Sequence, residues 1–148
     1  MANYAAQINR TASATLPVGS LGAPAASMRR VKLYELVCGS EAVAADNPFL
    51  WTVQRCTALG TSSAVTPIAL DSGDAACVAV VGKNHTVDAT QTAGAIVLSI
   101  PLNQRATFRW ISKPEGEIII PATASNGVAF NTPTMSALAV TATVHFSE

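Results

Sequence analysis

The sequence predicts an all-β protein with a single β-sandwich or jelly-roll-like domain over residues 29–148, preceded by an extended N-terminal arm over residues 1–28. Several segments alternate apolar and polar residues with a period of two, which places one set of side chains on a buried sheet face. Turn signals separate these segments at short intervals, as in sandwiches and barrels. The chain of 148 residues has the length of one domain, and its 12% of charged residues is about half the usual share.

The arm is expected from composition. Residues 11–28 carry no charge, contain Pro and Gly, and show neither a helical nor a strand period. Apolar side chains nevertheless recur along this segment, and a purely solvated tail would omit them. We therefore expect the arm to dock on a partner, with a disordered tail as the alternative. The partner-binding residues that we expect are Leu16, Val18, Leu21 and Met28.

The first strands of the domain are expected at residues 30–38 and 49–58. In the second of these, Phe49, Trp51 and Val53 share one phase of the alternation, which predicts that they face the core. An exposed Trp would instead offer a surface on which a sugar ring could stack. The apolar neighbours of Trp51 in this segment favour burial of its ring.

The middle of the domain gives three expectations. Residues 74–81 form either a short helix or a loop, and the sequence leaves both open. Residues 95–100 and 105–111 are expected to pair as a hairpin across residues 101–104. The alternation in 105–111 predicts that Phe108 and Trp110 point to the core.

The last strands are expected at residues 117–120, 128–130 and 137–146, with an Asn-Gly turn signal before the second of them. The final segment has the clearest alternation in the chain. The residues of its buried phase are Leu138, Val140, Ala142, Val144 and Phe146.

No motif in the sequence carries catalytic chemistry, so the chain is not expected to be an enzyme, and no cofactor is expected. The three cysteines, Cys38, Cys56 and Cys77, form no CxxC pair, and we expect them to be reduced and packed as small apolar residues. His85 and His145 have no metal-ligating companion nearby. Residues 71–74 resemble the start of a calcium loop but lack its spacing, and a turn is expected there.

Charge argues against nucleic acid and membrane as partners. The nine basic residues are scattered among nine acidic ones, so no basic face is expected. The uncharged stretches contain too many polar residues to span a membrane, and the N-terminus lacks the apolar region of a secretory signal. Three arginines alternate onto polar faces, where we expect ion pairs between neighbouring strands or subunits: Arg55, Arg105 and Arg109.

A resemblance to a known family rests on several short segments. They are residues 45–51 (ADNPFLW), 54–58 (QRCTA), 66–67 (TP), 84–86 (NHT), 102–110 (LNQRATFRW) and 120–124 (IPATA). Together they resemble small structural proteins of tailed bacteriophages, of the capsid cement or decoration type.

This resemblance implies a non-enzymatic protein of the outer capsid surface, made in the host cytoplasm. It also implies that the major capsid protein is the partner, that the chain forms a homo-oligomer such as a trimer, and that the arm reaches across neighbouring capsid subunits. The alternative from another class is a sugar- or receptor-binding β-sandwich head of a phage tail protein. That function requires an exposed Trp near polar side chains.

Overall fold

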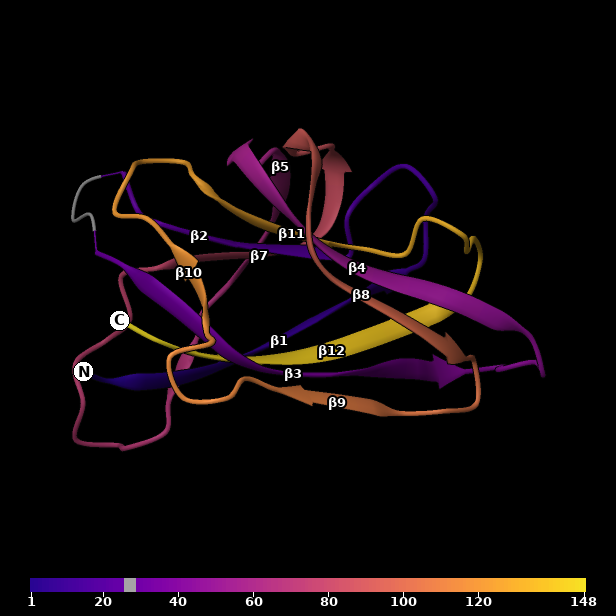
Figure 1. Cartoon of the computed structure of the whole chain (residues 1–148), viewed down its shortest axis with the longest axis horizontal. Helices are drawn as coiled ribbons and strands as arrows, with labels where there is room; N and C mark the ends of the chain where they lie inside the picture. Colours follow the sequence, from indigo (N-terminus) through magenta and orange to yellow (C-terminus); the bar gives the residue numbers. More distant parts are fainter. Residues whose placement is uncertain (26–28) are drawn as a thin grey trace.

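Two antiparallel β-sheets pack face to face in the computed structural model, which describes residues 1–25 and 29–148 (Figure 1). Sheet A contains β1 (Asn3–Thr11), β3 (Val31–Ala42), β6 (Ile68–Ala69), β9 (Phe108–Ile111), β10 (Ile118–Ile120) and β12 (Ala139–Ser147). Sheet B contains β2 (Gly19–Gly22), β4 (Pro48–Ala58), β5 (Thr61–Val65), β7 (Val80–Val87), β8 (Thr90–Asn103) and β11 (Gly127–Asn131). The expected all-β sandwich is confirmed.

The strand order is that of a jelly roll. Sheet A runs β10-β3-β12-β1-β6, with β9 beside β10 on the same edge of β3, and sheet B runs β5-β7-β2-β11-β4-β8. Four nested pairs result: β1 with β12, β2 with β11, β3 with β9 and β10, and β4 with β8. The chain is therefore one long hairpin wrapped around a core, and β5, β6 and β7 are an insertion that extends the sheets beside β1 and β2.

The prediction of an extended arm over residues 1–28 is wrong for residues 1–25, the part of that segment that the structure describes. β1 pairs along its whole length with β12, from Asn3 opposite Ser147 to Thr11 opposite Ala139, and β2 lies between β7 and β11. Ile8 is fully buried. The apolar residues that looked like docking points on a partner are the inward-facing side chains of two strands. Their period is hidden because β2 has only four residues and a loop separates it from β1.

The alternation of the last strand is confirmed, because its predicted inward-facing residues are all buried in the core. The same holds for Phe49, Trp51 and Val53 of β4, which are at most 3% exposed. Residues 74–79 contain bends and irregular backbone, so the loop alternative is the correct one for that part. β5 and β6 were not expected.

The expected hairpin between residues 95–100 and 105–111 is wrong. β8 pairs with β4 in sheet B, whereas β9 pairs with β3 in sheet A, so the segment between them crosses from one sheet to the other. Its anchor is Gln104, which is 6% exposed and whose side-chain oxygen accepts a hydrogen bond from the backbone N–H of Ala45 at 2.9 Å. The short separation of the two segments in the sequence suggested a hairpin. The buried side-chain amide of Gln104 instead anchors a connection that crosses from sheet B to sheet A.

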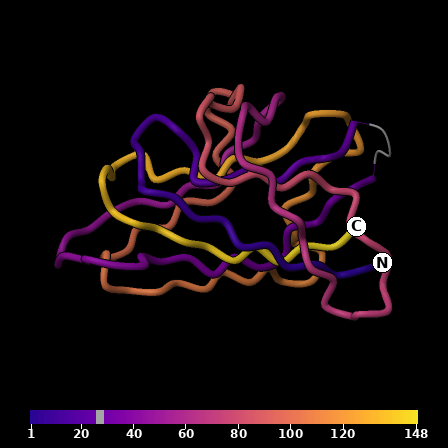
Figure 2. Tube along the Cα trace, turned by 180° about the vertical axis from the view of Figure 1, so that it is seen from behind, coloured from indigo at the N-terminus to yellow at the C-terminus, as the bar shows by residue number. Residues whose placement is uncertain are grey.

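The two ends of the chain lie side by side, as both views of the backbone show (Figures 1 and 2). Ala2 and Glu148 exchange two backbone hydrogen bonds of 3.2 Å. The Glu148 carboxylate also accepts hydrogen bonds from the backbone N–H groups of Val78 and Ala79, each at 2.9 Å. The C-terminal residue thereby holds the loop between β6 and β7.

Candidate functional site

The four expected partner-binding residues do not form a common surface. Val18 and Leu21 are fully buried in the core between the sheets, so neither can contact a partner while the domain is folded. Leu16 is half-buried and lines a surface cleft. Met28 lies outside the described residues.

That cleft lies on the outer face of sheet B and has a volume of about 430 Å³. In Figure 1 the indigo loop between β1 and β2 stands above sheet B beside β4. The loop supplies one wall, and strands β4, β8 and β11 with their adjoining turns supply the rest. The lining residues are Ser13, Ala14, Thr15, Leu16, Leu50, Thr52, Gln54, Asp88, Gln91, Ile96, Asn131 and Pro133.

The loop wall is fixed in place by hydrogen bonds. Arg10 donates through Nη1 to the carbonyl oxygens of Pro17 at 2.8 Å and His85 at 3.1 Å, which ties the loop to β7. Ser13 Oγ accepts from the backbone N–H groups of Thr15 and Leu16 at 3.3 and 3.2 Å, a local turn that shapes the loop tip. The cleft therefore has a defined shape before anything binds.

A chain of polar side chains crosses one end of the cleft. Gln91 Nε2 donates to Asp88 Oδ1 at 3.0 Å, and Asn131 Nδ2 donates to Gln91 Oε1 at 3.0 Å. Each group orients the next, so the free oxygen of the Asp88 carboxylate has a set direction. Among the described lining residues Asp88 alone carries a charge.

Sequence reasoning did not find this cleft, because its residues come from four separate segments of the chain. One signal was present: Thr52 and Gln54 occupy the outward phase of β4. Thr52 is nevertheless only 3% exposed, which is unusual for a side chain on the outer face of a sandwich. An outward polar residue that the fold covers marks the position of the cleft.

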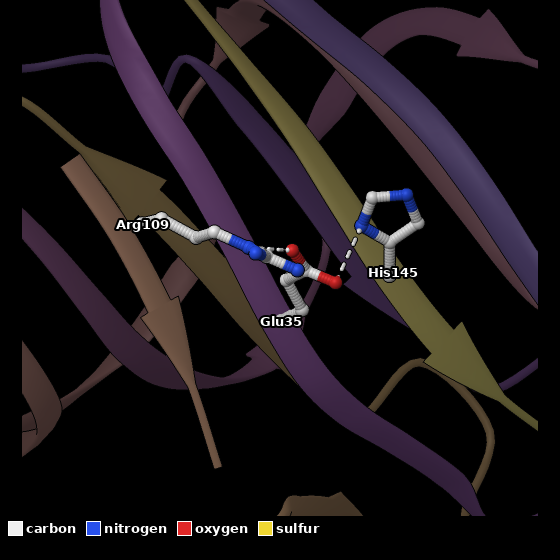
Figure 3. Close-up of polar contacts among 3 residues, drawn as sticks. All are labelled: Glu35, Arg109 and His145. Carbon is white, nitrogen blue, oxygen red and sulfur yellow. Dashed lines mark hydrogen bonds and ion pairs between the residues drawn. The ribbon is translucent and has the colours of Figure 1, made fainter. Parts of the chain in front are cut away.

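A second polar cluster lies on the outer face of sheet A, where three strands meet (Figure 3). Glu35 of β3 forms an ion pair with Arg109 of β9 and approaches His145 of β12, with 3.4 Å between Glu35 Oε2 and His145 Nδ1. Tyr34 stacks on the His145 ring, with 6.3 Å between the ring centroids. Arg109 holds one carboxylate oxygen of Glu35, and His145 Nδ1 forms no hydrogen bond with a described residue, so the ion pair is the contact that joins β3 to β9 here.

The expectation of ion pairs is therefore confirmed for Arg109. The pair contributes at most about 1 kcal/mol, because the Arg109 side chain is 61% exposed. Arg55 instead donates to the carbonyl oxygen of Ile119 at 2.8 Å and links sheet B to sheet A. Arg105 donates to the carbonyl oxygen of Ala44 at 3.4 Å.

The cysteines are free thiols, as expected, and Cys38 and Cys56 are buried while Cys77 is half-buried. Burial raises the pKa of Cys38 and Cys77 to about 12 and that of Cys56 to about 11. At neutral pH they are protonated and poor nucleophiles. His85 is 1% exposed, and burial lowers its pKa, an effect that outweighs the opposing influence of the Val87 carbonyl and the Asp88 carboxylate.

Residues 71–74 form the expected turn, with the Gly73 N–H donating to Asp71 Oδ1 at 2.8 Å. In the described ranges 1–25 and 29–148, His, Cys, Asp and Glu side chains form no group of three that could hold a metal ion. The same ranges contain no helix long and apolar enough to cross a membrane.

No family model, curated protein or solved structure matches this chain.

Proposed function

We propose that this chain is a non-enzymatic structural protein of a tailed-phage virion, a cement or decoration protein that bridges major capsid protein subunits on the outer capsid surface. The proposal draws on the sequence resemblance, on the low charge and on the jelly-roll strand order, which viral capsid domains also use. Many unrelated functions share one fold, and the exposed surface of this sandwich gives more specific support.

The observation that carries the proposal is the apolar rim of the sandwich. Large apolar side chains are exposed at the sheet edges and in turns, where a neighbouring subunit would make lateral contacts. The rim consists of Val43, Ile68, Leu70, Ile96, Val97, Phe108 and Ile111, which are 37–96% exposed. The outer face of sheet A, in contrast, carries polar side chains such as Gln7, Asn9, Thr141 and Thr143.

The rim replaces the arm in the mechanism. Because β1 and β2 belong to the sheets, they cannot leave the domain to span capsid subunits without unfolding it. Lateral contacts of the rim would instead join copies of this chain, in a trimer or another homo-oligomer, and join them to the major capsid protein. Each contact is weak, but icosahedral symmetry repeats it many times.

Cryo-electron microscopy of purified virions tests the location. Density for this sandwich between capsid subunits on the outer surface is the expected result, with rim residues at the contacts. Density on the tail, or none on the virion, would overturn the cement proposal.

Two matched variants test the rim itself. Ile68→Lys places a charge on the rim, and Thr143→Lys places the same charge on the polar outer face of sheet A. We expect Ile68→Lys to lose occupancy on isolated capsids while Thr143→Lys keeps it. Equal occupancy of the two folded variants would contradict the role of the rim.

A sugar- or receptor-binding head of a tail protein remains the second candidate function. The version of it in which a sugar ring stacks on an exposed tryptophan is not supported. Trp51 is 1% exposed, and Trp110 is half-buried and packs against the core. Trp51 therefore presents no ring face on which a sugar could stack, and Trp110 is partly covered by the core. Virion density on the tail would favour this candidate.

A further inference from the structure

We infer that the cleft on the outer face of sheet B is a binding site for a neutral saccharide. The inference does not rest on the cement proposal and does not use either tryptophan, and Ile96 is the one residue that the cleft shares with the rim. It depends on the shape of the cleft, its polar groups, its aliphatic surface and its charge.

The shape suits a small molecule. About 430 Å³ falls within the roughly 300–1,000 Å³ range of small-ligand sites. The floor is formed by side chains on a sheet face, whereas an extended peptide gains its affinity chiefly by pairing with the backbone of a sheet edge. Because Arg10 and Ser13 already fix the loop wall, binding does not have to order it.

Polar groups in the cleft are available for hydroxyl groups. Thr52 lines the cleft and is 3% exposed. A hydroxyl group on the floor of a cleft can exchange a hydrogen bond to water for one to a ligand hydroxyl. The carboxylate of Asp88 is held by Gln91 and keeps one oxygen free to accept a hydrogen bond.

Aliphatic side chains lie among these polar groups. Leu16, Leu50 and Ile96 line the same cleft and offer apolar surface to the C–H face of a pyranose ring. They give less stacking energy than an aromatic ring, so we expect millimolar affinity for a monosaccharide. The single charge, that of Asp88, disfavours anionic ligands, and the uncharged hydroxyl and amide groups that make up the rest of the polar lining match a neutral polyol.

NMR titration of the isolated, ¹⁵N-labelled protein tests the inference. The probes are the methyl α-glycosides of glucose, galactose and mannose, N-acetylglucosamine, and sialic acid as the anionic comparison. We expect saturable shifts of the backbone amides of Thr52, Gln54, Gln91 and Asn131 with at least one neutral sugar, and none with sialic acid. The absence of saturable shifts at these positions with all four neutral sugars would overturn the inference.

A conservative variant separates binding from folding. Thr52→Val removes the hydroxyl while keeping the shape, and the loss of one hydrogen bond should weaken sugar binding about three- to tenfold. Urea unfolding of the variant beside the wild type checks that Thr52→Val is folded under the conditions of the titration. Thr143→Val, on the outer face of sheet A, should leave affinity unchanged, and equal affinities of the two variants would contradict the site.

Both assays use the isolated protein without a capsid. Failure of sugar binding would therefore leave the cement proposal standing, and absence from the capsid would leave the saccharide site standing.

Discussion

Replacing Ile8 by Ala distinguishes a folded first strand from a detachable arm. Ile8 lies in β1 and is fully buried. Removing three carbon atoms costs about 2.4 kcal/mol of transfer free energy, at ~0.8 kcal/mol for each buried methylene. Any cavity that remains adds to this cost, at about 24 cal/mol per Å³.

The surroundings of Ile8 argue that the cavity will not close. A Cβ atom built on Gly19 would lie 2.8 Å from Ile8 Cγ2, so Ile8 packs directly over the backbone of β2. That backbone is hydrogen-bonded to β7 on one side and β11 on the other, which holds it in place. We therefore expect Ile8→Ala to lower the free energy of unfolding by about 3–4 kcal/mol, within the usual range for such changes.

Urea unfolding followed by tryptophan fluorescence measures this loss, since Trp51 is buried in the same core. Gln7→Ala is the matched control, because Gln7 is the exposed neighbour of Ile8 on the outer face of β1, and it should change stability by less than about 0.5 kcal/mol. An Ile8→Ala protein as stable as the wild type would show that β1 is not part of the core and would restore the arm.

Three further predictions follow from buried polar groups and thiols. Burial holds the pKa of His85 in the folded protein below its ordinary 6.5, so the unfolded chain takes up a proton at a higher pH than the folded chain does. The free energy of unfolding should therefore fall as the pH drops below about 6.5, by at most about 1.4 kcal/mol per pH unit. Thermal unfolding of the wild type and of His85→Gln at pH 7.5 and 5.5 should show a smaller loss for the variant. A thiol reagent at pH 8 should leave the native protein essentially unmodified and label three thiols in urea, whereas fast native labelling would contradict the pKa values of Cys38, Cys56 and Cys77. Gln104→Leu removes the acceptor of the Ala45 N–H and should lower the free energy of unfolding by about 0.5–1.5 kcal/mol in the urea assay, because Ala45 is exposed and water can take the place of the amide oxygen. An unchanged midpoint would show that the loops do not depend on this amide.

The sequence predicted the long strands and their buried faces because local alternation encodes both. In β12 every second side chain is apolar, so Val140 and Val144 could be placed in the core without a structure. β2 could not be found in this way, since four residues with two glycines show no period. Pairing partners were also out of reach, because β8 and β9 follow each other in the chain and yet belong to different sheets.

The cleft could not be predicted for a related reason. Thr52 and Gln54 were correctly placed on the outer phase of β4, but no local pattern reveals that a loop from residues 13–16 covers them. Asp88 and Asn131 each resemble ordinary turn or strand-end residues. Their side chains meet through Gln91 only after the long hairpin has wrapped, so the site is a property of the topology.

The pairing of the first strand with the last sets the order of events during synthesis. When the ribosome has made β1, its partner in the sheet is still about 130 residues away, which is roughly 6–25 s of translation at about 5–20 residues per second. β1 cannot take its place between β6 and β12 in sheet A until β12 has left the exit tunnel of the ribosome. Such non-local pairing makes folding slow. Chains cut short before residue 139 would lack the strand that joins β1 to β3, and their apolar side chains would stay open to aggregation.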